Sequence, residues 1–396
     1  MSRPASTRAS LIFLALTLLG FLAASSAPTP LYHLYQEQLH FSPAVLTLIF
    51  GVYAFSLLAA LLIVGSLSDY LGRKPVIFVA LLLNMLAMLL FISADSVVWL
   101  ISTRLIQGFA TGMATSVLGA ALLDFDRRQG PLITSVAPLL GMACGALGGG
   151  LLAEFAPLPL QLTYWLLLGL FLAQAVYLWR LAESVSPQPG AWQSLRPTLH
   201  VPLQARQALW RVLPLNLAAW AVGGFYLSLA PSLVRTATGS TSNLIGGALV
   251  AVLTLSGALS IYLLRNQEAD KMLRSSASLL VIGLAWVLVA VHGASVPLFF
   301  MGTLVTGGGF GAGFLGALRS IMPLALPHER AGLMSAFYVL SYLAFSLPSL
   351  LAGNLTRVFG LIPTTDGYGA VLIVLCVVAL LGIRQSMRSV SDGARP

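Results

Sequence analysis

The chain has 396 residues, of which 58% are hydrophobic and only 8% are charged. A soluble domain carries about 25% charged residues, so this chain has too few to cover a water-facing surface. The composition therefore predicts an integral membrane protein. The net charge of +9 does not indicate a nucleic-acid partner, because the basic residues fall at the ends of apolar runs, where membrane proteins place them.

Apolar runs separated by polar breaks predict an all-α polytopic fold with twelve membrane helices. A crossing helix needs about 20 residues, so too little chain is left for a fused nucleotide-driven motor. The first run follows two arginines, as in a signal peptide, but it is too long for one and is taken as the first helix. The predicted helices span 9–28, 45–66, 75–93, 97–121, 131–153, 161–181, 209–231, 243–264, 275–292, 296–320, 331–353 and 367–385.

The distribution of lysine and arginine sets the expected topology. With the N-terminus inside, all but three of the 21 basic residues fall at cytoplasmic ends and loops, the exceptions being Arg104, Arg235 and Arg357. We therefore expect a multi-pass protein of the cell (inner or plasma) membrane with both termini in the cytoplasm.

A polar, proline-containing segment at 182–208 separates the predicted helices into six and six. It holds no apolar run long enough to cross a membrane. The sequence thus predicts an N-terminal six-helix bundle at 1–181, a cytoplasmic linker at 182–208, and a C-terminal six-helix bundle at 209–396 with a short cytoplasmic tail. Two such halves around a central cavity are typical of secondary transporters.

The sharpest motif is the turn GSLSDYLGRKP, between the second and third predicted helices. Its glycines permit a tight reversal, and one acid with two bases can form a charged latch at the membrane surface. For the two bases, a plain turn that obeys the positive-inside rule is an equally simple interpretation. The predicted conformational latch consists of Gly65, Asp69, Gly72, Arg73 and Lys74.

This turn resembles the loop signature of the major facilitator superfamily, G-x-L-[SA]-D-[RKY]-x-G-R-[KR]. The resemblance implies the major facilitator fold and transport by alternating access. It also implies that Asp69 and Arg73 stabilise the outward-open state through contacts that include the start of the eleventh helix, near Glu329 and Arg330.

The fourth predicted helix carries an arginine inside its apolar run, LISTRLIQGFATG. A charge there costs several kcal/mol unless it faces water or a partner, so Arg104 is a candidate functional residue. The alternative is a side chain that extends to the outer interface. Arg104, Gln107 and Gly108 resemble the family's helix-4 signature, in which the arginine is linked to proton coupling, and we expect them to couple protons or bind substrate.

Glycines spaced by four on the fifth predicted helix allow close approach of another helix, and packing alone explains the spacing. The run also resembles the antiporter signature of drug-exporting facilitators, G-x3-G-P-x2-G-G. Ala146 replaces its proline, and Leu132 replaces an earlier glycine. The resemblance favours export by antiport. The matching glycines are Gly141, Gly145, Gly149 and Gly150.

Helices that would line a facilitator's cavity offer aromatic rings with a few hydrogen-bonding groups, which suit a drug-sized or sugar-sized ligand. For Tyr32, Tyr35 and Trp99, a position at the membrane interface is the simpler interpretation. The cavity candidates are Ser26, Tyr53, Asn216, Trp220, Tyr226, Thr306, Tyr338 and Tyr342.

None of the 12 acidic residues falls in the middle of a predicted helix. Facilitators that export cations commonly place an acid there, so the resemblance favours a neutral or anionic substrate. Candidates for a proton-coupling acid or base then lie near helix ends, at Asp124 inside and at His33 and Glu37 outside.

Together these features predict a secondary active transporter of the multidrug-resistance type, which exports small drug-like or sugar-like compounds by proton antiport. A facilitator-type importer or uniporter of a small nutrient is the alternative. A polytopic membrane enzyme is disfavoured, because the acid pair Asp124 and Asp126 is followed at once by two arginines. We expect no catalytic residue, cofactor or metal, and a monomer whose partners are its substrate, protons and the lipid bilayer.

Overall fold

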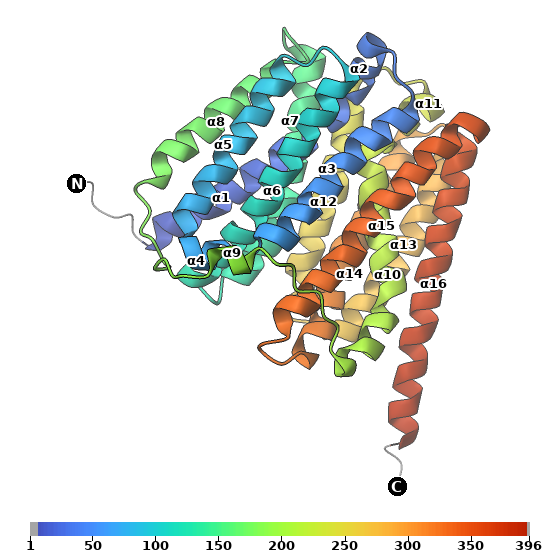
Figure 1. Cartoon of the computed structure of the whole chain (residues 1–396). Helices are drawn as coiled ribbons and strands as arrows, with labels where there is room; N and C mark the ends of the chain where they lie inside the picture. The colour runs from blue at the N-terminus through green and yellow to red at the C-terminus, as the bar shows by residue number, and fades with distance from the viewer. Residues whose placement is uncertain (1–6, 394–396) are drawn as a thin grey trace. The chain divides into compact units, whose positions relative to one another are not determined.

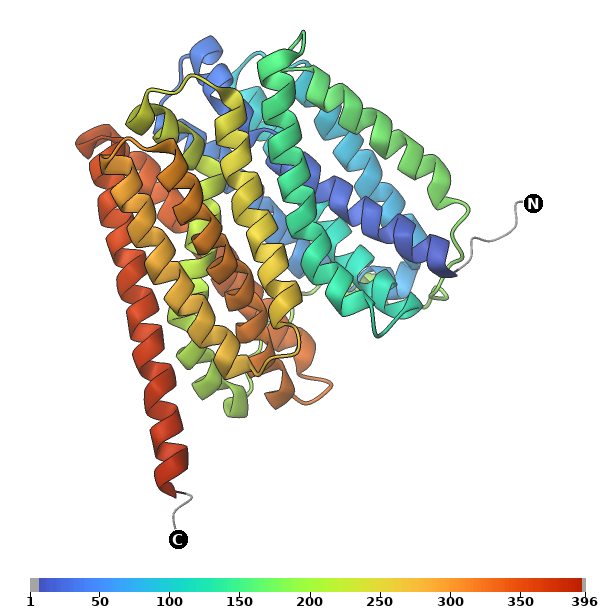
Figure 2. The same cartoon turned by 180° about the vertical axis from the view of Figure 1, so that it is seen from behind.

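The computed structural model describes residues 7–393, with side chains described to residue 383. Within these residues every regular element is helical (Figure 1 and Figure 2). The helices are α1 (Thr7–Ser26), η1 (Thr29–Leu31), α2 (Tyr32–Leu39), α3 (Pro43–Val64), α4 (Ser68–Leu71), α5 (Arg73–Ile92), α6 (Val97–Phe125), α7 (Gly130–Phe155), α8 (Leu162–Leu178), α9 (Ala191–Ser194), α10 (Leu203–Ser228), α11 (Ala230–Thr238), α12 (Asn243–Leu264), α13 (Ala269–His292), α14 (Val296–Ile321), η2 (Met322–Leu324), α15 (Arg330–Phe359) and α16 (Leu361–Gly393).

Each of the twelve predicted ranges coincides with a long helix, but fewer than twelve meet the requirements for a membrane span. Ten helices among the described residues are long and apolar enough to cross. The pair α10 and α11 adds an eleventh if it is counted as one span, although it bends by 65°. The bend has a local cause, because Pro231 at the start of α11 lacks the N–H that would continue α10. The remaining helix, α8, has only 17 residues.

The described chain forms two compact units. One contains the residues up to Thr198 together with Ser242–Ala251, and the other contains Leu199–Thr241 together with the residues from Val252 onward. Helix α10 begins at Leu203, within the segment 182–208 that was predicted to be a linker.

In the first unit, the predicted glycine spacing on α7 is used for packing against α1. A Cβ atom at Gly141, Gly145 or Gly149 would meet a main-chain carbonyl oxygen of α1 or of the turn that follows it. Gly108 and Gly112 on α6 lie against carbonyl oxygens of α3 in the same way. Glycine is needed at these positions because the two backbones approach too closely for any side chain.

In the second unit, the glycine-rich run of α14 lies between two neighbouring helices. Gly307 and Gly311 contact the backbone of α12, and a Cβ at Gly309 would lie 2.8 Å from the carbonyl oxygen of Ser276 on α13. The run therefore allows α14 to pack closely against both neighbouring helices.

Candidate functional site

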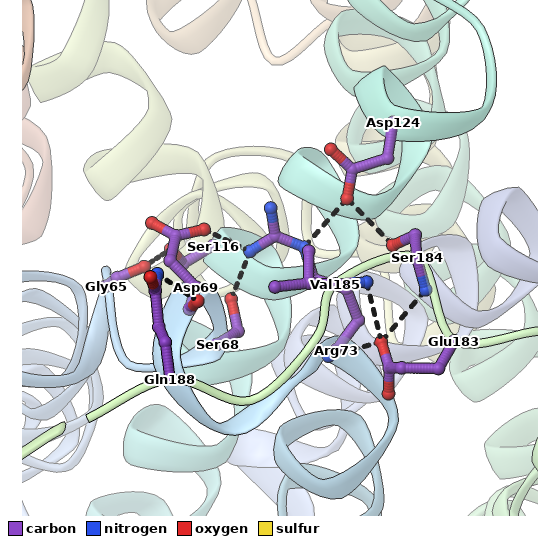
Figure 3. Close-up of polar contacts among 10 residues, drawn as sticks. All are labelled: Gly65, Ser68, Asp69, Arg73, Ser116, Asp124, Glu183, Ser184, Val185 and Gln188. Atoms are coloured by element: carbon purple, nitrogen blue, oxygen red, sulfur yellow. Dashed lines mark hydrogen bonds and ion pairs between the residues drawn. The ribbon is translucent and has the colours of Figure 1, made fainter. Parts of the chain in front are cut away.

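The charged turn between α3 and α5 is organised around Arg73 (Figure 3). Its guanidinium donates to Asp69 at 2.5 Å, to the Asp124 carboxylate at 2.9 Å and to the Ser68 hydroxyl at 2.7 Å. The Arg73 side chain is only 9% exposed, whereas those of Asp69 and Asp124 are 51% and 29% exposed. One nearly buried cation is thus shared by two carboxylates, one of them from the far end of α6.

A third acid, Glu183, caps the helix that Arg73 begins. Its carboxylate accepts the main-chain N–H groups of Arg73 at 2.8 Å and of Lys74 at 3.0 Å. These N–H groups have no partner within α5, and the positive end of the helix dipole favours a negative charge there. Gly72 makes the tight entry possible, with a φ of +93° that side chains other than glycine rarely adopt.

The segment after Glu183 continues along the same turn. The Ser184 hydroxyl donates to Asp124 at 2.9 Å, and the Gln188 side-chain amide donates to the carbonyl oxygen of Asp69 at 3.0 Å. The Gln188 N–H also donates to the Tyr70 carbonyl at 2.9 Å. The polar segment that follows α8 is therefore attached to the charged turn over several residues.

Of the five predicted latch residues, Asp69, Gly72 and Arg73 come together. Lys74 does not join the ion pairs, because its ammonium lies 5.5 Å from the centroid of the Trp179 ring. Gly65 contributes its carbonyl oxygen, which accepts the Ser116 hydroxyl at 2.7 Å.

The charged turn that precedes α15 forms contacts of its own in the second unit. The Glu329 carboxylate accepts the Leu326 N–H at 3.0 Å and the Gln204 side-chain amide at 2.8 Å. A contact of Asp69 and Arg73 with the start of α15 stays a prediction.

Arg104 is the most deeply buried charged side chain among the described residues, at 1% exposure. Its guanidinium donates to the Ser25 carbonyl oxygen at 3.0 Å and to the Gln107 side-chain oxygen at 2.6 Å. Gln107 in turn donates to the Ala24 carbonyl oxygen at 2.9 Å. The side chain is therefore directed from α6 towards the end of α1 and does not reach the surface of the unit.

Two tyrosine rings complete the surroundings of Arg104. Its guanidinium carbon lies 4.7 Å from the centroid of Tyr53 and 5.6 Å from that of Tyr32. The expected interfacial position is wrong for Tyr32 and Tyr35, which are 2% and 1% exposed, whereas Trp99 is 39% exposed. The first two tyrosines lie beyond α1 on the same span, Thr7–Leu39, and the Tyr35 hydroxyl donates to that of Tyr164 at 3.4 Å.

Within the described part of the chain, Arg104 contacts no carboxylate, and its Nε has no hydrogen-bond acceptor. Its partners are one carbonyl oxygen, one amide oxygen and two aromatic rings, all of which are neutral. Such groups solvate a cation without cancelling its charge. The site therefore keeps a net positive charge inside a helix bundle.

The polar cavity candidates fall into two groups. Three are buried and tie helices together: Ser26 donates to the Met142 carbonyl at 2.8 Å, Asn216 to the Ser341 hydroxyl at 2.9 Å, and Tyr226 pairs with Thr303 at 2.8 Å. A fourth, Thr306, is also buried but bonds within α14, where its hydroxyl donates to the Gly302 carbonyl at 2.8 Å. A fifth, Tyr53, lies over Arg104.

The other three candidates, Trp220, Tyr338 and Tyr342, are half-buried and form an aromatic cluster in the second unit. Trp220 lies 4.9 Å from Tyr342, and Tyr342 lies 6.2 Å from Tyr338, between ring centroids. Phe314 and Phe345 each lie 5.8 Å from Trp220.

Sequence reasoning missed the partners that come from distant parts of the chain. Asp124 was a candidate for proton coupling, but its pairing with Arg73, 51 positions away, had no local signal. The capping role of Glu183 spans 110 positions, and the Ser25 carbonyl has no side-chain signature at all.

The number of long apolar helices defines a polytopic membrane protein. The sequence profile of the Major Facilitator Superfamily matches residues 12–347, so the chain belongs to this superfamily.

Among curated relatives, the chain is similar to the multidrug resistance protein MdtL of Salmonella paratyphi B and of Salmonella typhimurium. The identity is 36% over 117 residues, which is 28% of this chain and 30% of each relative's length. Among solved structures, it is similar to the human organic anion transporter MFSD10 (TETRAN), with a TM-score of 0.70 and 17% identity, and to a mutant of the nucleoside transporter NupG, with a TM-score of 0.71 and 14% identity. Each covers 95% of this chain and 100% of the compared chain, and at these identities the likeness concerns the fold.

Proposed function

We propose that this protein exports small organic compounds, neutral or anionic, by proton antiport, and that Arg104 is the residue on which substrate binding or proton coupling depends. The observation that carries the proposal is the burial of Arg104 at 1% exposure among neutral partners only. A buried positive charge without a carboxylate attracts anions and repels cations. A compensating negative charge that arrives with a substrate would therefore be stabilised there.

Two similarities support the proposal. The relative MdtL is called a multidrug resistance protein, and one chain with a similar fold is called an organic anion transporter. As part of the proposal, this chain also exports its substrate and accepts organic anions. We further propose that it acts as a monomer and that both termini lie in the cytoplasm.

In the same proposal, the cluster of Asp69, Arg73 and Asp124 serves as the conformational latch of alternating access. It can do so because it combines short ion pairs with partial exposure, so that its bonds break at moderate cost. The bundle around Arg104 would then supply the ligand contacts.

Proton movement across everted membrane vesicles tests the proposal. The vesicles are energised and then challenged with neutral, anionic and cationic compounds of similar size. We expect proton release with neutral or anionic compounds, lost in Arg104→Gln and retained in Arg357→Gln, which removes an exposed arginine. Release with cations only, or equal release in Arg104→Gln, would contradict it. Substrate movement without any proton release would point to the uniporter alternative.

A further inference from the structure

A groove of about 900 Å³ lies in the second unit, lined by residues of α12, α13 and α14. Most of its wall is apolar, and several wall leucines are strongly exposed: Leu259 at 56%, Leu263 at 64% and Leu304 at 55%. All three helices are long and apolar enough to cross a membrane. Exposed leucines on such helices have acyl chains as their natural neighbours.

One end of this groove carries two positive charges. Lys271 and Arg274 line it from the first two turns of α13, next to the turn that joins α12 and α13. The nearby carboxylate of Asp270 is engaged elsewhere, in an ion pair of 3.1 Å with Arg211. Arg274 is held in place by a hydrogen bond of 3.3 Å from its Nε to the Asp270 carbonyl oxygen. The end of the groove is therefore cationic, and its length is apolar.

A buried hydroxyl group points to a ligand with hydrogen-bond acceptors. Ser260 lines the groove and is 8% exposed, yet its Oγ has no hydrogen-bond partner among the described residues. Its neighbour Ser256 instead donates to the Val252 carbonyl at 2.7 Å. Ser260 lies four residues before the end of α12, which is about 6 Å below the helix end.

We propose that this groove binds an anionic phospholipid. The phosphate lies between Lys271 and Arg274, the glycerol ester oxygens accept from Ser260 one helical turn deeper, and one acyl chain follows the groove towards Leu279 and Leu304. The order of cation, hydroxyl and apolar wall along the groove matches the order of phosphate, ester and chain in the lipid. Charge complementarity selects an anionic lipid over a zwitterionic one. The site does not depend on the transported substrate or on proton coupling.

Lipid binding to the purified full-length protein, measured by native mass spectrometry, tests the site. The probes are phosphatidylglycerol and phosphatidylcholine with identical chains. Each lost charge should weaken phosphatidylglycerol binding about 5-fold, so the double variant Lys271→Gln/Arg274→Gln should lose about 25-fold. Binding of phosphatidylcholine should weaken less, because its choline already balances the phosphate charge. Arg265→Gln is the matched control. It removes a charge from the same turn, but Arg265 stacks on Tyr262 at 3.8 Å and does not line the groove.

A second variant, Ser278→Trp, fills the groove at an exposed position without changing charge, and it should weaken binding of both lipids. Three outcomes would overturn the site: no change in Lys271→Gln/Arg274→Gln, an equal loss in Arg265→Gln, or full binding in Ser278→Trp. Displacement of the lipid by glycerol phosphate at equal concentration would also overturn it, because the cations would then hold a free phosphate without an acyl chain.

Discussion

Two arginines of the first unit are both nearly buried, yet they have opposite surroundings. Arg73 begins helix α5, and its guanidinium lies between two carboxylates and also donates to the Ser68 hydroxyl. Its main-chain N–H donates to the capping carboxylate of Glu183. Arg104 lies inside the bundle and contacts a carbonyl oxygen, an amide oxygen and two rings. The first charge is neutralised locally, whereas the second is only solvated.

This difference separates a structural role from a ligand-dependent one. A neutralised pair at a partly exposed turn changes little in energy when a small charged molecule binds elsewhere. A buried cation without a counter-ion destabilises the fold. An anion that reaches it is therefore bound by an electrostatic attraction that no protein carboxylate already satisfies. Function should therefore depend on substrate charge at Arg104 and on conformational equilibrium at Arg73.

The largest effect is expected for Arg104→Gln. This variant removes the buried positive charge with which a bound anion would pair, so affinity for the anionic compound that gives the strongest proton release should fall about 100-fold. The affinity of Arg104→Lys should lie between those of the parent protein and Arg104→Gln, because an ammonium keeps the charge but not the planar fork of donors. Substrate-induced quenching of tryptophan fluorescence measures the affinity. Arg73→Gln should change this affinity less than 2-fold. An equal loss of affinity in both variants would contradict the different roles assigned to Arg73 and Arg104.

The next effect concerns stability at Arg73. Arg73→Gln leaves Asp69 and Asp124 without their cation, and the free energy of unfolding should fall by about 1 to 2 kcal/mol, a value reduced by the exposure of both acids. Thermal unfolding in detergent measures it. Adding Asp124→Asn to Arg73→Gln should cost less than the sum of the single changes, because the second change removes an unpaired charge. Strict additivity would show that the two residues do not interact.

Part of the two arginine sites follows from the sequence. Asp69 and Arg73 stand four apart in one motif, where the tight turn at Gly72 brings them together, and Arg104 and Gln107 stand three apart on one helix and therefore share a face. The remaining partners come from packing of distant segments. Glycine spacing on α7 predicted a close helix contact, but nothing in it identified α1 as the partner.

The positions of the long helices were predicted from the sequence, but the bend between α10 and α11 was not. Apolar runs locate every long helix, because burial in lipid or protein requires them. The 65° break between α10 and α11 was missed, although Pro231 was visible within the predicted helix 209–231. A proline stops one helix from continuing, but the direction of the next depends on its neighbours.

A smaller effect is expected where Glu183 caps α5. Glu183→Ala removes the acceptor for two helix N–H groups and should cost about 1 kcal/mol. Glu183→Gln keeps an acceptor but loses the charge at the positive helix end, and should cost about 0.5 kcal/mol. Hydrogen exchange at the first turn of α5 reports both, with α8 amides as the internal reference. Faster exchange throughout the unit, not only in that turn, would contradict a local cap.

The smallest effect is expected at Asp126, an exposed acid in the turn between α6 and α7. Its carboxylate accepts the N–H groups of Gln129 at 2.9 Å and Arg128 at 2.8 Å, and these bonds hold its pKa below the usual carboxyl range. Because the pKa is lower in the folded turn, the contribution is complete above the ordinary carboxyl pKa and is lost as the pH falls through the folded value. Protease cleavage of this turn should therefore accelerate at low pH in the parent protein. In Asp126→Asn, the amide oxygen accepts the same N–H groups at every pH, so cleavage should follow only the pH dependence of the protease itself. An identical pH profile in both proteins would mean that ionisation of Asp126 does not stabilise the turn.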